Sequence, residues 1–84
     1  MYYVYVLLNK SNIKDNYLGF TSNLENRLDA HNSNQNTSTR GREWELVYYE
    51  AYINKKSAQN RERKLKHDGR VKRYLMERIM EQFK

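Results

Sequence analysis

The chain has 84 residues, which predicts one domain over residues 1–84, and it is basic, with 16 Lys and Arg against 10 Asp and Glu for a net charge of +6. It has no cysteine, so neither disulfides nor thiolate metal sites are expected. No apolar run approaches the roughly 20 residues that span a bilayer, so no membrane span is expected. We therefore expect a cytoplasmic location. The positive charge favours a nucleic-acid partner over a merely soluble surface.

The first predicted element is a strand at residues 2–8 (YYVYVLL), whose two alternating faces are both apolar. Tyr5 lies on one face, and Val4 and Val6 lie on the other. Such a strand is covered on both sides and is expected in the centre of its sheet. The polar residues 9–15 are predicted to form a turn, and residues 16–20 (NYLGF) a second strand that completes a hairpin.

A helix is predicted to follow the hairpin directly and to run to about residue 32. Ser22 and Glu25 fit the S-x-x-E capping pattern that opens a helix. Arg27 and His31 are four residues apart, so their side chains are expected to point the same way. Residues 33–43 are polar and are predicted to form a surface loop.

The longest predicted strand covers residues 44–53 (WELVYYEAYI), and its alternation places Leu46 and Tyr48 on the same face. Two helices are predicted after it, one over residues 55–66 with Asn54 as N-cap and one over residues 70–83 with an apolar stripe that ends at Phe83. The order ββαβαα predicts an α+β fold in which helices flank a three-stranded antiparallel sheet.

Residues 17–32 (YLGFTSNLENRLDAHN) carry the most specific motif in the chain. They resemble the pattern Y-x-G-x-T-x-x-L-x-x-R-x-x-x-H-N of small, single-domain bacterial members of the GIY-YIG nuclease superfamily. Shorter matches lie further on, so the resemblance covers about residues 2–66. The chain is similar to the UPF0213 group and to the N-terminal nuclease domain of bacterial excinuclease, which implies a GIY-YIG-like fold.

The resemblance implies a catalytic site built from Tyr5, Tyr17, Arg27, His31 and Glu62. Tyr5 matches the tyrosine of the GIY motif, the family's proposed general base, and Tyr17 matches that of the YIG motif, beside the scissile phosphate. The ordinary pKa of a phenol is about 10, so a nearby cation and metal would have to lower the pKa of Tyr5. Arg27 matches the arginine that binds phosphate, and His31 would position water or phosphate or share the role of base.

Glu62 matches the family's metal-binding glutamate, and the implied cofactor is Mg²⁺, with Mn²⁺ as an alternative. One carboxylate with water and phosphate oxygens is an ordinary Mg²⁺ shell. Two alternatives stay open: an ion pair between Glu62 and Lys66, four residues on, and Glu50 as a rival carboxylate.

Basic residues outside this site are expected to contact the phosphate backbone, although solvated charge is the ordinary alternative. Trp44, which follows a basic loop, is expected to stack a base. The predicted nucleic-acid contacts are Arg40, Arg42, Lys55, Lys56, Arg61, Arg63, Lys64 and Lys66.

The expected function is metal-dependent hydrolysis of DNA phosphodiester bonds by an endonuclease of low intrinsic sequence specificity. RNA as a substrate and a protein partner for targeting are left open, and a monomer or weak dimer is expected. Tyr3 stands where the family usually has glycine, and no residue after Lys66 matches the family's supporting Asn. These departures motivate an alternative, a nucleic-acid-binding module of the same fold with little or no activity. A protein-binding adaptor is the third hypothesis.

Overall fold

Three strands and three helices make up the part of the chain that the computed structural model describes, residues 1–33 and 41–84. Strands β1 (Tyr2–Asn9), β2 (Asn12–Thr21) and β3 (Trp44–Tyr52) form an antiparallel sheet in the order β2-β1-β3. Helix α1 (Leu24–Asn32) follows β2, and α2 (Lys55–His67) and α3 (Gly69–Glu81) follow β3. The predicted α+β fold and its element order are confirmed.

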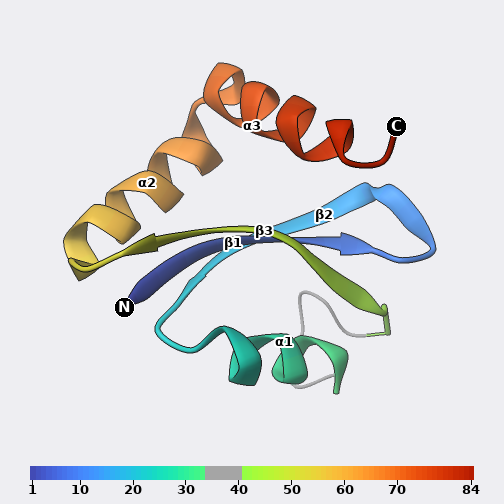
Figure 1. The fold of residues 1–84 in the computed structure, drawn as a ribbon, viewed down its shortest axis with the longest axis horizontal. Helices are drawn as coiled ribbons and strands as arrows, with labels where there is room; N and C mark the ends of the chain where they lie inside the picture. Colours follow the sequence, from blue (N-terminus) through green and yellow to red (C-terminus); the bar gives the residue numbers. More distant parts are fainter. Residues whose placement is uncertain (34–40) are drawn as a thin grey trace.

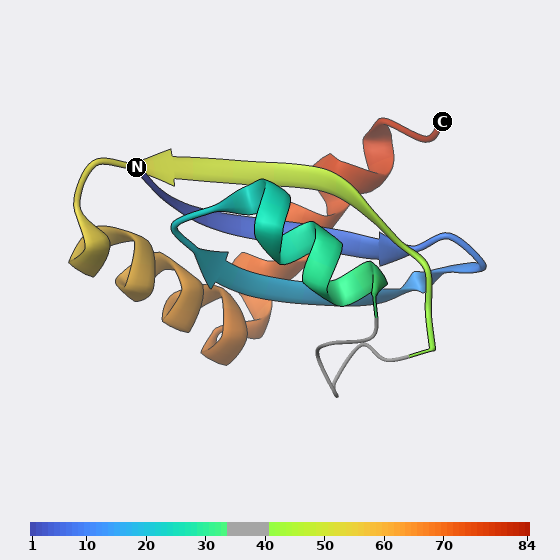
Figure 2. The ribbon, with the colours of Figure 1, turned by 90° about the horizontal axis from the view of Figure 1, so that it is seen from below.

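The sheet lies between two helical layers (Figure 1). Helix α1 covers one face, and α2 and α3 cover the other (Figures 1 and 2). On the α2 and α3 side, Val4 and Val6 pack in a buried cluster with residues such as Leu65. On the α1 side, Tyr5 and Leu7 pack in a second cluster. Strand β1 is therefore central and buried on both faces, as its two apolar faces predict.

The connection between β1 and β2 is shorter than the predicted turn. Asn9 already pairs with Asn12, so only Lys10 and Ser11 join the strands. The Oδ1 of Asn9 accepts a hydrogen bond from the backbone N–H of Ser11 at 2.9 Å, which fixes this tight turn. The first residues of β2 are exposed on an edge strand, so they need no apolar alternation, and the sequence pattern did not reveal them.

Helix α1 begins one residue later than the S-x-x-E pattern predicts. Asn23, rather than Ser22, is the N-cap, and its side chain accepts a hydrogen bond from the backbone N–H of Asn26 at 3.1 Å. Thr21 Oγ1 in turn accepts from the backbone N–H of Asn23 at 3.1 Å, which ties the start of α1 to the end of β2.

Strand β3 contains a bulge that breaks its predicted alternation. Val6 pairs with Tyr48, whereas the next residue, Leu7, pairs with Leu46, so Val47 is the extra residue. Leu46 consequently packs on the α1 side and Tyr48 on the α2 and α3 side. The prediction that these two side chains share a face was wrong, because a bulge shifts the alternation by one residue.

One aspartate joins the last two helices. Asp68 ends α2, and its Oδ1 accepts hydrogen bonds from the backbone N–H groups at the start of α3. Helix α3 buries Leu75 and Ile79 but ends at Glu81, so Phe83 lies beyond the helix and is exposed, contrary to the prediction. Within residues 1–33 and 41–84, no helix combines the length and apolar character that crossing a membrane requires.

Candidate functional site

Tyr5 occupies the centre of the site, in the middle of the central strand. Its side chain is almost fully buried, and its direct partner on β2 is Gly19. A Cβ atom at Gly19 would lie 2.5 Å from Cζ of Tyr5, closer than real Cβ contacts come. The glycine of the Tyr-x-Gly motif therefore makes room for the tyrosine ring of the neighbouring strand.

The hydroxyl of Tyr5 meets two nitrogen groups from α1. His31 Nε2 lies 3.0 Å from this oxygen, and Arg27 Nε–H donates to it at 3.4 Å. The Tyr17 ring lies 4.6 Å from the His31 ring and 6.3 Å from the Tyr5 ring, measured between centroids. The structure thus brings together four of the five predicted catalytic residues, and the predicted common direction of Arg27 and His31 is confirmed.

Burial and the charge of Arg27 set the protonation of this cluster. Burial raises the pKa of Tyr5 to about 12 and outweighs the hydrogen bond from Arg27, which lowers it. The pKa of His31 is lowered, first by burial and then by the charge of Arg27. At neutral pH the phenol is therefore protonated and the imidazole is neutral, so the Tyr5 O–H can donate to His31 while its oxygen accepts from Arg27.

Glu62 lies on helix α2, which packs on the opposite face of the sheet from α1. Ala58 and Leu65 on the same helix are fully buried, and the Glu62 side chain is 22% exposed. Its charge is one of those that raise the pKa of Tyr5, so the carboxylate lies within electrostatic range of the phenol. The alternative ion pair also exists, since Lys66 Nζ lies 3.3 Å from Glu62 Oε2.

A divalent ion bound here would have the Glu62 carboxylate as its proposed protein ligand. Among the described residues, no group of three or more His, Cys, Asp and Glu side chains could hold a metal ion alone. Glu62 would supply one carboxylate oxygen, and water and phosphate oxygens would supply the rest. Such an oxygen shell suits Mg²⁺ or Mn²⁺ better than softer metals.

Glu50 is fully engaged on the opposite face of the sheet from Tyr5. Its two oxygens accept hydrogen bonds from the hydroxyls of Tyr48 and Tyr52, both at 2.5 Å, and from the Arg61 guanidinium at 2.9 and 3.0 Å. Burial acts to raise the pKa of Glu50, but the hydrogen bonds from Arg61 and the two tyrosines lower it overall. This carboxylate anchors β3 to α2 and is not placed to join the Tyr5 cluster.

The predicted nucleic-acid contacts occupy different settings. Arg61 uses its guanidinium in the pair with Glu50, and Arg42 places its Cζ 5.7 Å from the centroid of the Trp44 ring. Arg40 lies outside the described residues. The remaining five are exposed along α2: Lys55, Lys56, Arg63, Lys64 and Lys66.

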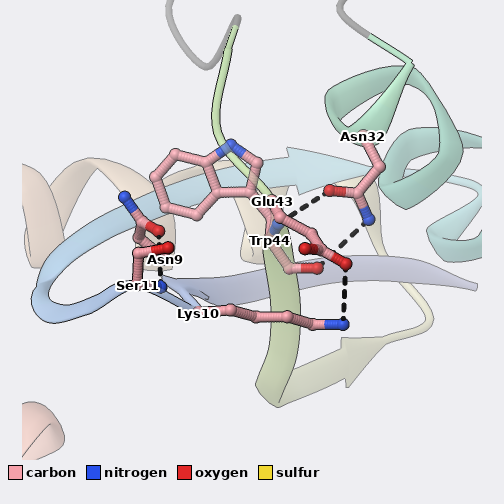
Figure 3. Close-up of polar contacts among 6 residues, drawn as sticks. All are labelled: Asn9, Lys10, Ser11, Asn32, Glu43 and Trp44. Carbon is pink, nitrogen blue, oxygen red and sulfur yellow. Dashed lines mark hydrogen bonds and ion pairs between the residues drawn. The ribbon is translucent and has the colours of Figure 1, made fainter.

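Trp44 is a core residue with 1% exposure, so the expectation that it stacks a base was wrong. Its backbone is held by Asn32, whose Oδ1 accepts from Trp44 N–H at 2.7 Å and whose Nδ2 donates to Trp44 O at 3.1 Å (Figure 3). A second link beside it joins Lys10 Nζ to Glu43 Oε1 at 3.3 Å (Figure 3).

Sequence reasoning missed this role of Asn32. It directly follows His31, so its two hydrogen bonds hold the end of α1 against β3 and fix the position of the imidazole. The sequence signal for this role was the Asn that ends the motif in residues 17–32. An amide side chain can both accept a hydrogen bond from a strand backbone and donate one to it.

Comparisons with known proteins agree with this geometry. A profile of the GIY-YIG catalytic domain matches residues 1–74. A UPF0213 protein of Clostridium perfringens is 47% identical over 64 residues, which cover 74% of this chain and 67% of the relative. A UPF0213 protein of Oceanobacillus iheyensis is 34% identical over 83 residues, which cover 96% of this chain and 94% of the relative.

A third UPF0213 protein, from Lactiplantibacillus plantarum, is 39% identical over 74 residues, covering 83% of this chain and 71% of the relative. No solved structure matches the chain. The profile match spans most of the sequence and includes every residue of the Tyr5 cluster as well as Glu62. The chain therefore belongs to the GIY-YIG family, with UPF0213 proteins among its relatives.

Proposed function

We propose that the protein is a divalent-metal-dependent endonuclease that hydrolyses DNA phosphodiester bonds with low sequence specificity. The observation that carries this proposal is the convergence of Arg27 and His31 on one hydroxyl, that of Tyr5, at 3.4 and 3.0 Å. A cation, a neutral imidazole and a phenol at one point can bind a phosphate and move a proton. Membership of a family of catalytic domains supports the same conclusion.

In the proposed mechanism, Tyr5 and His31 remove the proton of the attacking water together. A phenol whose pKa is about 12 is a poor base alone at neutral pH. Neutral His31 can accept the phenolic proton at Nε2 while the Tyr5 oxygen takes a proton from water. The water oxygen then bonds to phosphorus, the bond from phosphorus to the leaving oxygen breaks, and the leaving oxygen takes a proton from solvent to become a hydroxyl.

In this mechanism Arg27 would stabilise the phosphate charge directly, and Glu62 would contribute by holding a divalent ion. The Arg27 guanidinium would neutralise the phosphate as negative charge grows on its oxygens. Tyr17, next to His31, would hold the phosphate in place. Glu62 would hold the divalent ion, which when bound polarises the phosphate and stabilises the leaving oxygen.

Replacement of Glu62 tests this proposal. We expect Glu62→Ala to reduce cleavage by about 100-fold or more, because it removes the only carboxylate proposed to hold the ion. Cleavage would be measured on single-stranded, duplex, nicked and branched DNA, each with Mg²⁺, with Mn²⁺ and with EDTA. The far-ultraviolet circular dichroism and the DNA affinity in EDTA should stay close to wild type.

Glu77→Ala is the matched control, since it removes an exposed carboxylate of α3 that pairs only loosely with Arg73, at 3.9 Å. It should cleave like wild type. Cleavage by Glu62→Ala at the wild-type rate in Mg²⁺ would contradict the role of Glu62.

A nucleic-acid-binding module of the same fold is the second candidate. The raised pKa of Tyr5 favours it, since a buried phenol with this pKa resists ionisation. This candidate expects DNA binding that is insensitive to EDTA, with no cleavage of any substrate in the panel. Cleavage that is lost in Arg27→Ala would count against it.

A further inference from the structure

Helix α1 covers only part of the sheet face that carries Tyr5. Figure 2 looks onto this face, and the start of β1 and the ends of β2 and β3 extend beyond the helix at the left of the view. Leu24 and Leu28 of α1 pack on the cluster that contains Tyr5 and Leu7. The rest of the face is left to the side chains of the strands themselves.

Tyr49 stands on this face directly across from Tyr5. The two residues are partners in the β1–β3 ladder, so their side chains leave the sheet on the same side with Cβ atoms roughly 5 Å apart. Tyr5 is buried, whereas Tyr49 is 54% exposed. An accessible aromatic ring thus stands on β3, across β1 from the proposed catalytic hydroxyl, which lies over Gly19 on β2.

Tyr3 holds the Tyr49 ring in a defined position. The two rings meet edge to face, with centroids 5.8 Å apart and an angle of 70° between their planes. Tyr3 also lines a hollow at the start of α1 with Ser22, Asn23 and their neighbours. A planar group lying on Tyr49 would therefore have a braced ring beneath it and open space beside it.

The charge around this end of the sheet matches a polyanion. Lys55 and Lys56 are exposed and follow β3 after a two-residue link, and Arg27 donates a hydrogen bond to the Tyr5 hydroxyl. A half-exposed strand tyrosine by itself is ordinary. Cations past the end of β3 and on α1 could hold the phosphates of a strand whose base lies on this ring, as in a single-strand binding groove.

We propose that Tyr49, braced by Tyr3, stacks an unpaired nucleobase next to the scissile phosphate. This inference rests on the proposed function and specifies its substrate class. Stacking on a side chain requires an accessible base face, and bases inside a duplex have both faces covered by their neighbours. The preferred substrate is therefore a DNA strand that is unpaired at the cut.

The test is a binding measurement in EDTA, which does not depend on cleavage. The probe is a short single-stranded DNA carrying one 2-aminopurine, whose fluorescence is quenched on stacking, with the matching duplex alongside. Tyr49→Ala should bind the single strand roughly 5- to 150-fold more weakly and lose the quenching, whereas Tyr49→Phe keeps both. Affinity for the duplex should change little.

Tyr74→Ala is the matched control, because Tyr74 is 57% exposed on α3, in the opposite layer. It should bind like wild type. Tyr49→Thr keeps strand propensity without a ring and serves if Tyr49→Ala does not fold. Equal losses for Tyr49 and Tyr74 variants, or equal weakening on single strand and duplex, would overturn the stacking proposal.

Failure of the two proposals can be told apart. Absence of cleavage together with binding that depends on the Tyr49 ring would reject the endonuclease and retain the stacking site. Metal-dependent cleavage of single strands at the wild-type rate by Tyr49→Ala would retain the endonuclease and reject the stacking site.

Discussion

At the scale of single residues, the Tyr5 hydroxyl is constrained by two partners with opposite requirements. Arg27 can only donate to its oxygen, whereas His31 Nε2 accepts its proton when the neutral imidazole carries its own proton on Nδ1. The ring itself fits because Gly19 has no side chain. Strands β1 and β2 and helix α1 therefore act together at this one oxygen. They set the orientation of the Tyr5 ring, its packing and the path of its proton.

The contact between Tyr5 and Gly19 gives a prediction about stability. We expect Gly19→Ala to lower the free energy of unfolding by about 1–3 kcal/mol, because the added methyl overlaps the Tyr5 ring. Cleavage should fall as well, since the ring must move away from His31. Urea denaturation, followed by circular dichroism, measures the first effect.

Gly69→Ala is the control, because a Cβ there has no neighbour within 4 Å and the residue begins α3. Its effect should lie within about 1 kcal/mol and favour the folded state, since alanine is the better helix former. Equal destabilisation at both glycines would show that the Tyr5 ring does not require the space at Gly19.

His31 predicts how stability depends on pH. Its folded-state pKa lies below the ordinary value of 6.5, so below pH 6.5 the unfolded chain binds a proton there that the folded chain does not. The free energy of unfolding should therefore fall as the pH is lowered from 6.5. Arg27 and Tyr5, which face the imidazole, do not titrate in this range.

Denaturation curves at pH 7.5 and at pH 5 measure this effect for wild type and for two variants. His31→Gln should show a smaller loss over this interval than wild type. His67→Gln removes an exposed histidine and should show the wild-type loss. The same loss in all three proteins would mean that His31 is not the source.

At the scale of elements, the two faces of the sheet have different tasks. The α1 face holds Tyr5 and its partners, while the α2 and α3 face holds the larger apolar cluster. A polar anchor crosses the second face, where Glu50 of β3 receives both nitrogen donors of Arg61 from α2. This anchor fixes the helix that carries Glu62, one residue beyond Arg61.

We expect Arg61→Ala to lower the free energy of unfolding by about 2–3 kcal/mol, because it leaves a largely buried carboxylate with two tyrosine hydroxyls as partners. Arg63→Ala removes an exposed arginine of the same helix and should change it by no more than about 0.5 kcal/mol. Urea denaturation of the two variants and of wild type gives the free energies of unfolding to be compared. A small effect at Arg61 would show that the pair with Glu50 contributes little to stability.

Local patterns in the sequence predicted the strands and helices, because each pattern reflects a physical requirement of the element that carries it. The two apolar faces of β1 require cover on both sides, and the spacing of Arg27 and His31 is one helical turn. The motif in residues 17–32 then assigned Tyr17 and His31 to one site. These inferences needed only neighbours in the chain.

The features that stayed hidden depend on residues far apart in the chain. The bulge at Val47 is visible only in the pairing with β1, and the engagement of Glu50 requires Arg61, eleven residues later. Trp44 beside Arg42 resembles an exposed stacking group in sequence, but its ring is buried in the core with Tyr5 and Leu7. Tertiary packing determined each of these outcomes.

At the scale of the whole molecule, the position of the positive charge matters more than its total. The start of α2 brings Lys55 and Lys56 to the end of the sheet that α1 leaves uncovered, where β3 ends. Arg70 and Arg73 lie instead on α3, the next helix of the same layer, and not at the end of β3. We expect a DNA strand held on Tyr49 to run along β3 toward its end, where it would meet the first pair and not the second.

Salt dependence of binding distinguishes these two pairs. The double variant Lys55→Gln/Lys56→Gln should reduce the slope of log K against log salt concentration for single-stranded DNA by up to about 1.4, since each lost phosphate contact removes about 0.7. Arg70→Gln/Arg73→Gln removes the same net charge and should leave the slope close to wild type. Fluorescence anisotropy in EDTA at a series of KCl concentrations gives both slopes. If both variants lowered the slope equally, binding would follow net charge alone, and the strand path proposed along β3 would be wrong.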